Sequence, residues 1–166
     1  MQFFSSNFKL GILGGGQLGK MLLSETKRYD IFSKVMDPNK NAPCSIIAND
    51  FVVGDLTNFE DVVNFGKEVD VVTVEIENVN TDALEFLENK WIKVFPSSST
   101  LRTIQNKSAQ KDFYKKHHLP TSEYSNYSCL KDLIDDYNNG NFQLPAVWKS
   151  AKFGYDGKGV KILNHK

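Results

Sequence analysis

Short apolar runs alternate with helix-like segments over roughly the first 95 residues of the chain. In the helix-like segments apolar residues recur at helical spacing, as Leu18, Met21 and Leu22 do. Another such segment opens with Thr57 and Glu60, which have the spacing of a capping box. Strands alternating with helices of this length predict right-handed crossovers and an open α/β fold, whose parallel sheet is covered on both faces. The runs predicted as strands are 8–13, 35–36, 51–53, 69–76 and 92–95.

The pattern changes after Pro96. Helical periodicity is predicted around Leu101 and Ile104, and again over 108–117. Two strands, 145–149 and Val160–Leu163, are predicted on either side of a glycine-rich loop. We therefore expect one domain at 1–100 and the beginning of an α+β domain at 101–166. A further helix in the second part is amphipathic, with apolar residues at Leu130, Leu133, Ile134 and Tyr137.

Charge and composition exclude several classes of protein. The 20 Lys and Arg residues balance the 20 Asp and Glu residues, which leaves no cationic surplus for a nucleic-acid backbone. No apolar run approaches the roughly 18 residues that cross a bilayer, and the start lacks the shape of a signal peptide. Cys44 and Cys129 form no CxxC motif and are interpreted as reduced packing residues. The expected compartment is the cytoplasm, with no nucleic-acid or membrane partner.

The first glycine-rich loop, Gly14 to Gly19, satisfies the G-x-G-x-x-G pattern between a predicted strand and a predicted helix. Glycines let the backbone approach a ligand closely, and the N–H groups at a helix N-terminus favour an anion. Asp37, eighteen residues beyond Gly19, has the place of a ribose-binding acid in a dinucleotide fold. Three interpretations stay open at this point: a nicotinamide dinucleotide, another phosphate ligand, or a tight turn only.

Two carboxylates, Glu75 and Glu77, lie at the end of the predicted strand 69–76. The period of a strand places both on the same side, at the carboxyl edge where open α/β sheets bind ligands. Glu75 is the better candidate, as a hydrogen-bond acceptor for a ligand hydroxyl or amine. The alternative is that the chain leaves the core here and both acids meet water.

A second glycine-rich loop, 149–159, contains three glycines, a Tyr-Asp pair and three lysines. Such a loop can fold over a polyphosphate with its N–H groups and a mobile ammonium, although it lacks the Walker A pattern. The alternative is an ordinary hairpin, for which Asp-Gly is a common turn. Since Arg28 and Arg102 are the only arginines, any phosphate is expected to be held mainly by lysines and backbone N–H groups.

A set of motifs follows in fixed order along the chain, namely 11–21, Asp37-Pro38, Gly54-Asp55, 74–79, 105–107, Gln110-Lys111 and 154–159. Together they resemble the N-terminal part of the 5-(carboxyamino)imidazole ribonucleotide synthases, the ATP-grasp carboxylases of purine biosynthesis. The resemblance implies a Rossmann-like pre-ATP-grasp domain at 1–100, followed by an incomplete ATP-grasp domain at 101–166. Such enzymes use ATP and Mg²⁺ to convert bicarbonate to carboxyphosphate, which carboxylates 5-aminoimidazole ribonucleotide.

The resemblance also implies roles for individual residues. Gly16, Gln17 and Leu18 would hold the ribonucleotide phosphate, and Glu75 would lie near the ribose or the aminoimidazole. Lys107, where many members have Arg, and Lys149 would bind ATP. The ATP-binding set continues through the second loop with Gly154, Tyr155, Asp156, Gly157, Lys158, Gly159 and Val160, of which Tyr155 and Asp156 would also be catalytic.

Family members are considerably longer than 166 residues, so the magnesium ligands are expected outside this chain. The chain alone is therefore expected to be inactive, and the full-length form is a possible homodimer. The main alternative is an NAD(P)-binding Rossmann oxidoreductase or dinucleotide-binding module. A non-catalytic interaction domain and other ATP-grasp enzymes of purine synthesis are further alternatives.

Overall fold

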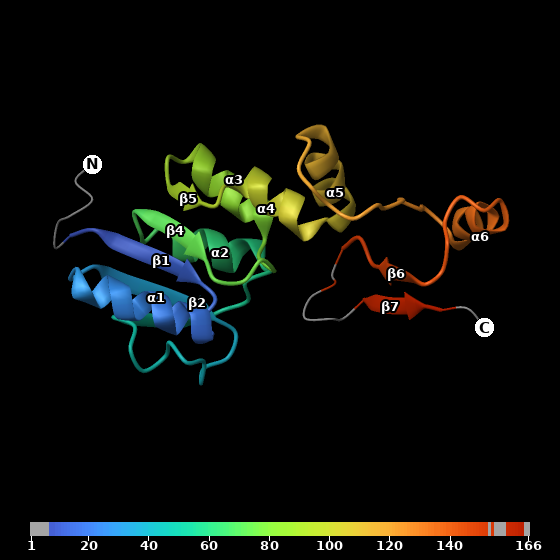
Figure 1. Cartoon of the computed structure of the whole chain (residues 1–166). Coiled ribbons are helices and arrows are strands. Elements are labelled where there is room, and N and C mark those ends of the chain that lie inside the picture. Colours follow the sequence, from blue (N-terminus) through green and yellow to red (C-terminus); the bar gives the residue numbers. More distant parts are fainter. Residues whose placement is uncertain (1–6, 153, 155–158, 165–166) are drawn as a thin grey trace. The chain divides into compact units, whose positions relative to one another are not determined.

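Two compact units, Met1–Arg102 and Thr103–Lys166, make up the chain (Figure 1). A computed structural model describes residues 7–152, 154 and 159–164. The first unit contains strands β1 (Lys9–Leu13), β2 (Phe32–Asp37), β3 (Asp50–Val53), β4 (Val71–Val74) and β5 (Lys93–Phe95), with helices α1 (Gln17–Arg28), α2 (Phe59–Gly66) and α3 (Thr81–Asn89). Helix α4 (Ser98–Gln105) crosses the boundary, and the second unit contains α5 (Lys107–Lys116), α6 (Leu130–Asn138), β6 (Ala146–Lys149) and β7 (Val160–Leu163).

The five strands of the first unit form one parallel sheet in the order β3-β2-β1-β4-β5. The predicted open α/β fold is therefore confirmed. The chain proceeds from β1 outward to β3 and then returns to the other side of β1 to form β4. The carboxyl ends of β1 and β4 flank the point where the strand order reverses, and this is where open α/β sheets bind ligands.

Side chains of β1 face the core on both sides of the sheet. Ile12 packs with Leu23 of α1 and with Cys44 on one face. Gly11 faces the other side, where a Cβ atom in its place would lie 2.9 Å from Cε1 of Phe65 in α2. Because successive residues of a strand point to opposite faces, α1 and α2 cover opposite faces of the sheet.

Helix α1 forms where it was predicted. The face that packs against the sheet, however, is not the face that carries Leu18, Met21 and Leu22. Those three side chains are exposed, Leu18 by 64% and Met21 by 59%. The buried residues of α1 are Gly19, Leu23 and Thr26. The helical spacing is thus correct, whereas the apolar stripe that it marks lies on the surface.

The predicted capping box at the start of α2 is wrong by one residue. Asn58 is the N-cap, and its side-chain oxygen accepts a hydrogen bond from the N–H of Asp61 at 3.1 Å. Thr57 instead donates its backbone N–H to Oδ1 of Asp55 at 2.8 Å. Thr57 therefore closes the turn before the helix, and it does not form a capping box with Glu60.

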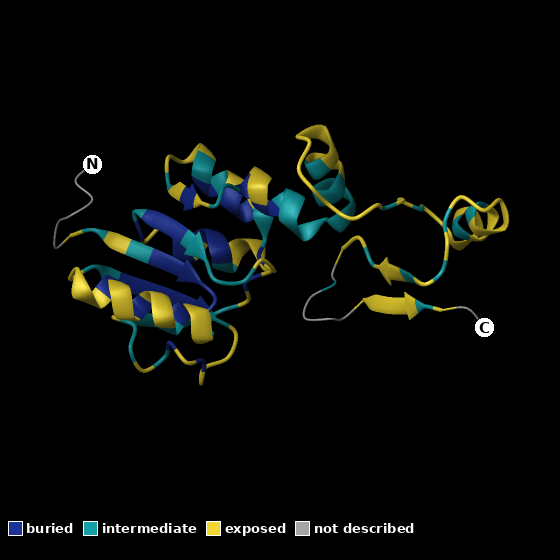
Figure 2. Cartoon of the chain, viewed as in Figure 1, coloured by how far each residue is buried: buried dark blue, intermediate teal, exposed yellow. Residues whose placement is uncertain are grey.

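The second unit has a two-stranded antiparallel sheet, in which Ala146 faces Leu163 and Lys149 faces Val160. None of its described residues is buried, and the dark blue of Figure 2 is confined to the first unit. Cys129 lies exposed at the N-cap of α6, so its predicted packing role is wrong. Among the described residues, no helix is long and apolar enough to cross a membrane.

Candidate functional site

The first glycine-rich loop joins the carboxyl end of β1 to the start of α1. Gly14 extends the sheet by one hydrogen bond, from its N–H to the carbonyl oxygen of Met36 at 2.9 Å, and has a φ of 101° that favours glycine. The carbonyl of Gly16 accepts the N–H of Lys20 at 3.0 Å, which closes the first turn of the helix. The loop therefore directs the N-terminus of α1 to the carboxyl edge of the sheet.

The N-terminus of α1 has no side-chain cap, because its N-cap residue is Gly16. Its first turn carries no acidic residue, and Gln17 and Leu18 are exposed there. By contrast, α2, α3 and α5 each begin with an asparagine whose side chain accepts backbone N–H groups. The first N–H groups of a helix have no partner within the helix, so this uncapped terminus offers donors to an anion.

Glu75 lies directly over this loop. Strand β4 ends at Val74, two residues before the predicted end at 76, and the N–H of Glu75 donates to the carbonyl of Leu13 at 2.8 Å. A Cβ atom at Gly14 would lie 2.8 Å from its Oε2, and one at Gly16 would lie 2.6 Å from its Oε1. These two glycines therefore make room for a carboxylate of the same chain.

Asp37, the last residue of β2, holds the loop from the other side. Its Oδ2 accepts the N–H of Gly15 at 2.8 Å, and its Oδ1 accepts the N–H of Asn39 at 2.8 Å. The carbonyl of Gly15 in turn accepts the N–H of Cys44 at 3.0 Å. Both carboxylate oxygens of Asp37 thus serve the backbone, which does not favour the ribose-binding role of the dinucleotide alternative.

The thiol of Cys44 lies buried beneath the loop, as its predicted packing role requires. Its Sγ is 3.7 Å from the carbonyl oxygen of Gly16. Burial raises the pKa of this thiol, and the carboxylates of Glu75 and Asp37 raise the same pKa further, against an opposing effect of Lys20. Cys44 is therefore a protonated packing residue at neutral pH and not a nucleophile.

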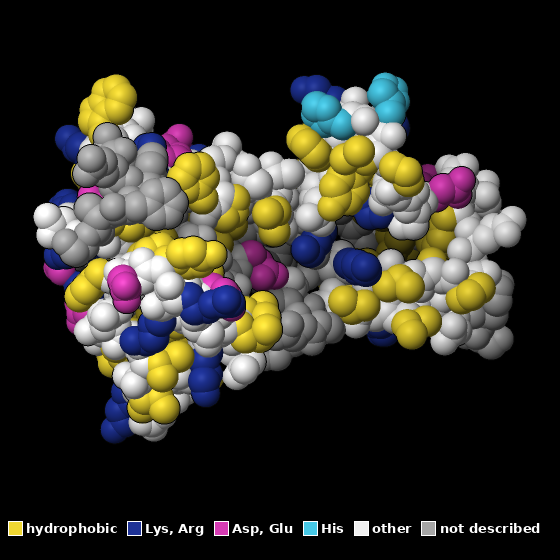
Figure 3. Space-filling view, turned by 60° about the vertical axis from the view of Figure 1, so that its left-hand side comes forward, with side chains coloured by type: hydrophobic (Ala, Val, Ile, Leu, Met, Phe, Trp, Pro, Cys, Tyr) yellow, Lys and Arg dark blue, Asp and Glu magenta, His cyan; other side chains and the backbone are white. Residues whose placement is uncertain are grey.

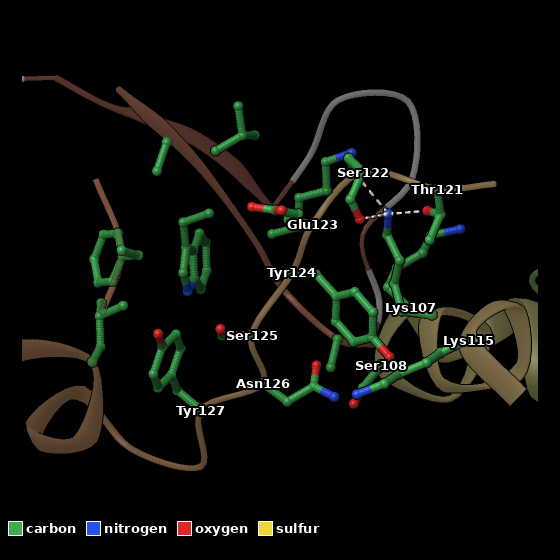
Figure 4. A pocket seen from close by; sticks show the side chains of 18 of the residues that line it. Lys107, Ser108, Lys115, Thr121, Ser122, Glu123, Tyr124, Ser125, Asn126 and Tyr127 are labelled. Carbon is green, nitrogen blue, oxygen red and sulfur yellow. Dashed lines mark hydrogen bonds between the residues drawn. The ribbon is translucent and has the colours of Figure 1, made fainter. Parts of the chain in front are cut away.

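The second unit has a large open groove of about 1770 Å³, lined by α5, the segment 118–127 and β6. Figure 4 shows this groove with Lys107 and Lys115 of α5 and the segment from Thr121 to Tyr127. Its volume exceeds the range of roughly 300–1,000 Å³ that is usual for a single small-molecule pocket. Four lysines line it, and they are Lys107, Lys111, Lys115 and Lys149.

The four lysines of the groove are not equivalent. The ammonium of Lys111 donates to Oγ1 of Thr121, and to Oγ of Ser122 at 2.8 Å (dashed lines in Figure 4). It also lies 5.6 Å from the ring centroid of Tyr124. In the part of the chain that the structure describes, the ammonium groups of the other three lysines have no such partner, so they are the ones available to a phosphate.

The second glycine-rich loop begins and ends beside the N-terminus of α5. The N–H of Lys107 donates to the carbonyl of Ala151 at 2.7 Å, and the N–H of Ser150 donates to the carbonyl of Gly159 at 2.8 Å. Gly159 has a φ of 72°, and a Cβ atom there would lie only 2.3 Å from Oγ of Ser150. The base of the loop is therefore closed next to Lys107.

The predicted ATP-binding residues occupy different parts of this region. Lys149 ends β6, Val160 begins β7, and both are exposed, while Gly154 is half-buried. The remaining four, Tyr155, Asp156, Gly157 and Lys158, lie outside the described residues.

Sequence reasoning missed several residues that shape these two regions. The anchoring of the loop by Asp37 and Cys44 was not foreseen, although the Asp37-Pro38 motif was noticed. Lys111 was noticed in the Gln110-Lys111 motif without a role. Its partners Thr121 and Ser122 come from an irregular segment, which offers no periodic signal in the sequence.

Comparison with known proteins identifies the first unit. Residues 8–105 match the ribonucleotide synthetase preATP-grasp domain. The chain belongs to this family. The preATP-grasp match contains the glycine-rich loop, Asp37 and Glu75, and so covers every residue of the first site.

Relatives of the preATP-grasp chain include a phosphoribosylaminoimidazole carboxylase from Candida albicans, 35% identical over 95% of this chain and 28% of that protein. The N5-carboxyaminoimidazole ribonucleotide synthase of Pseudomonas aeruginosa is 32% identical over 93% of this chain and 42% of its own length. These names confirm the predicted resemblance. The chain thus spans less than half the length of these two relatives.

A solved structure resembles this preATP-grasp chain across both units. It is the N5-carboxyaminoimidazole synthase of Aspergillus clavatus in complex with ADP and 5-aminoimidazole ribonucleotide. The TM-score is 0.81 at 34% identity, covering 97% of this chain and 42% of that one. In the described residues of our chain, no three His, Cys, Asp or Glu side chains gather as a metal site.

Proposed function

We propose that this chain is the N-terminal segment of an ATP-dependent ligase that carboxylates 5-aminoimidazole ribonucleotide. The observation that carries the proposal is the uncapped N-terminus of α1, which lies beside Glu75 at the carboxyl edge of a preATP-grasp sheet. Similarity to a synthase solved with ADP and this ribonucleotide supports it. In this proposal 1–100 is the pre-ATP-grasp domain and 101–166 begins the ATP-grasp domain.

The first unit would bind the ribonucleotide. Its phosphate would accept the N–H groups around Gly16, Gln17 and Leu18, because a helix N-terminus without a cap attracts an anion. The carboxylate of Glu75 repels a phosphate, so it would accept a hydrogen bond from a ribose hydroxyl or from the amine of the ligand instead. The phosphate of the ligand would thus meet the N–H donors of the loop, and its hydroxyl or amine would meet the carboxylate of Glu75.

The second unit would bind ATP along its groove. Lys107 and Lys149 would approach the phosphates, because in the described part of the chain their ammonium groups have no partner. The loop whose base is closed by Ser150 and Gly159 would cover the polyphosphate. From the family resemblance, Tyr155 and Asp156 in that loop would face the reacting groups.

The chemistry would proceed in two steps. Bicarbonate is a poor electrophile, so an oxygen of bicarbonate would first take the γ-phosphoryl group of ATP, giving carboxyphosphate and ADP. The amine of the ribonucleotide would then attack the carboxyl carbon, forming the C–N bond, breaking the C–O bond to phosphate and losing one proton. When bound, Mg²⁺ would neutralise charge on the phosphates. From the family resemblance, its ligands would come from the rest of the enzyme.

The decisive experiment measures steady-state ADP release by the full-length enzyme that carries this chain. Glu75→Gln should raise the KM for the ribonucleotide by about 10-fold or more and leave the KM for ATP within about 2-fold. Lys149→Met should raise the KM for ATP by about 10-fold or more and leave the KM for the ribonucleotide within about 2-fold. Equal effects of both variants on both substrates would contradict the assignment of one substrate to each unit.

Two controls separate this function from its alternatives. The 166-residue chain alone should release no ADP with bicarbonate and the ribonucleotide, and substantial turnover would contradict its proposed incompleteness. NADH mixed with the chain should show the same fluorescence as NADH alone. A saturable change in that fluorescence would favour the dinucleotide alternative.

Two finer parts of the proposal concern the setting of the enzyme. We place it in the cytoplasm, where the free thiols of Cys44 and Cys129 stay reduced. A homodimer of the full-length form stays a prediction.

A further inference from the structure

Asp37 occupies an unusual position for an acid at the carboxyl end of a parallel strand. It is half-buried, and both of its oxygens accept backbone N–H groups, from Gly15 at 2.8 Å and from Asn39 at 2.8 Å. An acid at this place in a dinucleotide-binding fold would instead accept the hydroxyls of a ribose. Here the carboxylate has no need of a ligand, because the backbone already supplies two donors.

The segment after Asp37 is folded back onto the same glycine. Oδ1 of Asn39 accepts the N–H of Asn41 at 3.0 Å, and the carbonyl of Asn39 accepts the N–H of Ala42 at 2.9 Å. This turn brings Cys44 to the loop, where its N–H donates to the carbonyl of Gly15 at 3.0 Å. Both polar groups of Gly15 are therefore bonded to the segment 37–44.

Gly15 also has no room to shift. A Cβ atom in its place would lie 3.1 Å from Cβ of Asp37, 3.2 Å from Cβ of Ala42 and 3.3 Å from the ring of Phe51. Two bonded polar groups and close packing on one side hold this residue at one orientation. The carbonyl of Gly15 shares one peptide plane with the N–H of Gly16, so the bond from Cys44 also fixes the direction of that N–H at the start of α1.

We propose that Asp37 is a positioning residue, which fixes the Gly15 backbone so that the next N–H groups converge on the phosphate of the ribonucleotide. This inference rests on the proposed function for the identity of the ligand. Asp37 itself does not contact the ligand. Its negative charge lies behind the loop, where two N–H donors offset the repulsion that it would otherwise exert on a phosphate.

The test compares two variants at this position with a matched control in the full-length enzyme. Asp37→Ala should raise the KM for the ribonucleotide by about 10-fold or more, with kcat and the KM for ATP within about 2-fold. Asp37→Asn should have a ribonucleotide KM between those of Asp37→Ala and the parent enzyme. The amide oxygen of Asn accepts one N–H group, while its NH₂ group faces the other donor. Equal rises in both KM values, or none, would overturn the proposal.

Asp55 provides the control, because it follows β3 by two residues, accepts the N–H two residues on as Asp37 does, and makes no hydrogen bond to the glycine-rich loop among the described residues. Its Oδ1 accepts the N–H of Thr57 at 2.8 Å and the hydroxyl of Thr57 at 2.7 Å. Asp55→Asn should leave both KM values unchanged. A rise in the ribonucleotide KM as large as that of Asp37→Ala would show a general effect of carboxyl-edge acids and would overturn the proposal.

A second measurement does not depend on the reaction. In the 166-residue chain, amide hydrogen exchange at Gly15 should accelerate by about 10-fold in Asp37→Asn, with the exchange of Leu23 unchanged. An unchanged rate at Gly15 would overturn the anchoring role. If the parent enzyme does not use the ribonucleotide, the proposed function fails, and the exchange rate still decides whether Asp37 holds the loop.

Discussion

The two units of this chain differ in how they use their apolar residues. In the described part of the chain every buried apolar side chain lies in the first unit, at or before Leu101. The second unit also contains apolar residues, and Figure 3 shows hydrophobic side chains in yellow on its visible face. Its exposed apolar residues include Leu130, Ile134, Tyr137, Val147, Trp148, Val160 and Ile162.

The difference follows from the architecture of each unit. A parallel sheet with helices on both faces encloses its apolar side chains, as Ile12 and Leu23 demonstrate. A two-stranded sheet has no second layer of its own, and such a hairpin is marginal in water. Secondary structure is therefore present in both units, whereas among the described residues a closed core is found in the first unit only.

The candidate sites differ in the same way. The glycine-rich loop of the first unit is held by Asp37, Cys44 and the sheet before any ligand arrives. Of the four lysines that line the groove of the second unit, Lys111 alone is held by described side chains, those of Thr121 and Ser122. We infer that the first site is preorganised, and that the second would gain much of its order from the nucleotide that we propose it binds.

The largest expected effect separates the two units. Leu84→Ala in α3 removes a fully buried side chain, so it should lower the free energy of unfolding by about 2–5 kcal/mol. Ile134→Ala in α6 removes a side chain that is 47% exposed and should change it by less than about 0.5 kcal/mol. Urea denaturation of the chain, followed by circular dichroism, measures both. Equal losses would mean that the second unit has a core of comparable strength.

The two cysteines offer a second comparison. Cys44 is fully buried and burial raises its pKa, whereas Cys129 is exposed. Because the thiolate is the reactive form, a disulfide reagent at pH 7.5 should modify Cys129 at least about 100-fold faster than Cys44. The variant Cys129→Ser isolates the slow reaction. Similar rates for the two thiols would show that the loop above Cys44 opens readily.

Helix caps provide a smaller effect. Asn80→Ala removes the acceptor for the N–H of Ala83 and a bond to the carbonyl of Thr57, which should cost about 1 kcal/mol of unfolding free energy. Asn106→Ala removes the acceptor for the N–H groups at the start of α5, a helix without buried residues. Asn106→Ala should accelerate amide exchange at Ser108 and leave the free energy of unfolding of the chain nearly unchanged. A full loss of global stability in Asn106→Ala would contradict the contrast between the units.

The smallest effect concerns salt. Hydrogen bonds from Arg102 and its charge lower the pKa of Glu85, whereas neutral donors, Asn141 and then Tyr127, lower the pKa of Asp136. Each lowered pKa stabilises the folded state at a pH above the ordinary carboxyl pKa. This contribution to folding stability is lost as the pH falls through the lowered pKa of the folded state. Added salt should raise the pKa of Glu85 and leave that of Asp136 nearly unchanged, since screening acts on charge pairs. Carboxyl carbon NMR titrations at low and high salt measure both.

The sequence was sufficient for the open parallel α/β fold and for the carboxyl edge at which the glycine-rich loop and Glu75 lie. Parallel strands bring their carboxyl ends to one edge, so the loop after β1 and the acid after β4 had to lie near each other. Periodicity located α1 but not its buried face, because Leu18 and Met21 have the same spacing as the residues that pack. The roles of individual polar groups were beyond the sequence.

Asp37 and Lys111 show why those roles were hidden. The sequence pattern of a ribose-binding acid and of a loop-anchoring acid is the same, and only the direction of the carboxylate separates them. Likewise Lys107 and Lys111 look alike in sequence, and the hydroxyls that occupy Lys111 come from a segment without regular structure. Tertiary contacts between distant segments decide such roles, and local pattern does not contain them.

The carboxylate of Glu75 over Gly14 and Gly16 has a consequence for how this chain can diverge. Positions 14, 16 and 75 share one volume, so a methyl group added at 16 must be matched by a shorter or displaced side chain at 75. We expect paired replacement at 16 and 75 across distant homologues, and no replacement at 14, where the φ of 101° is a separate demand for glycine. A directed-evolution library that varies 16 and 75 together should therefore yield more folded variants than one that varies either position alone.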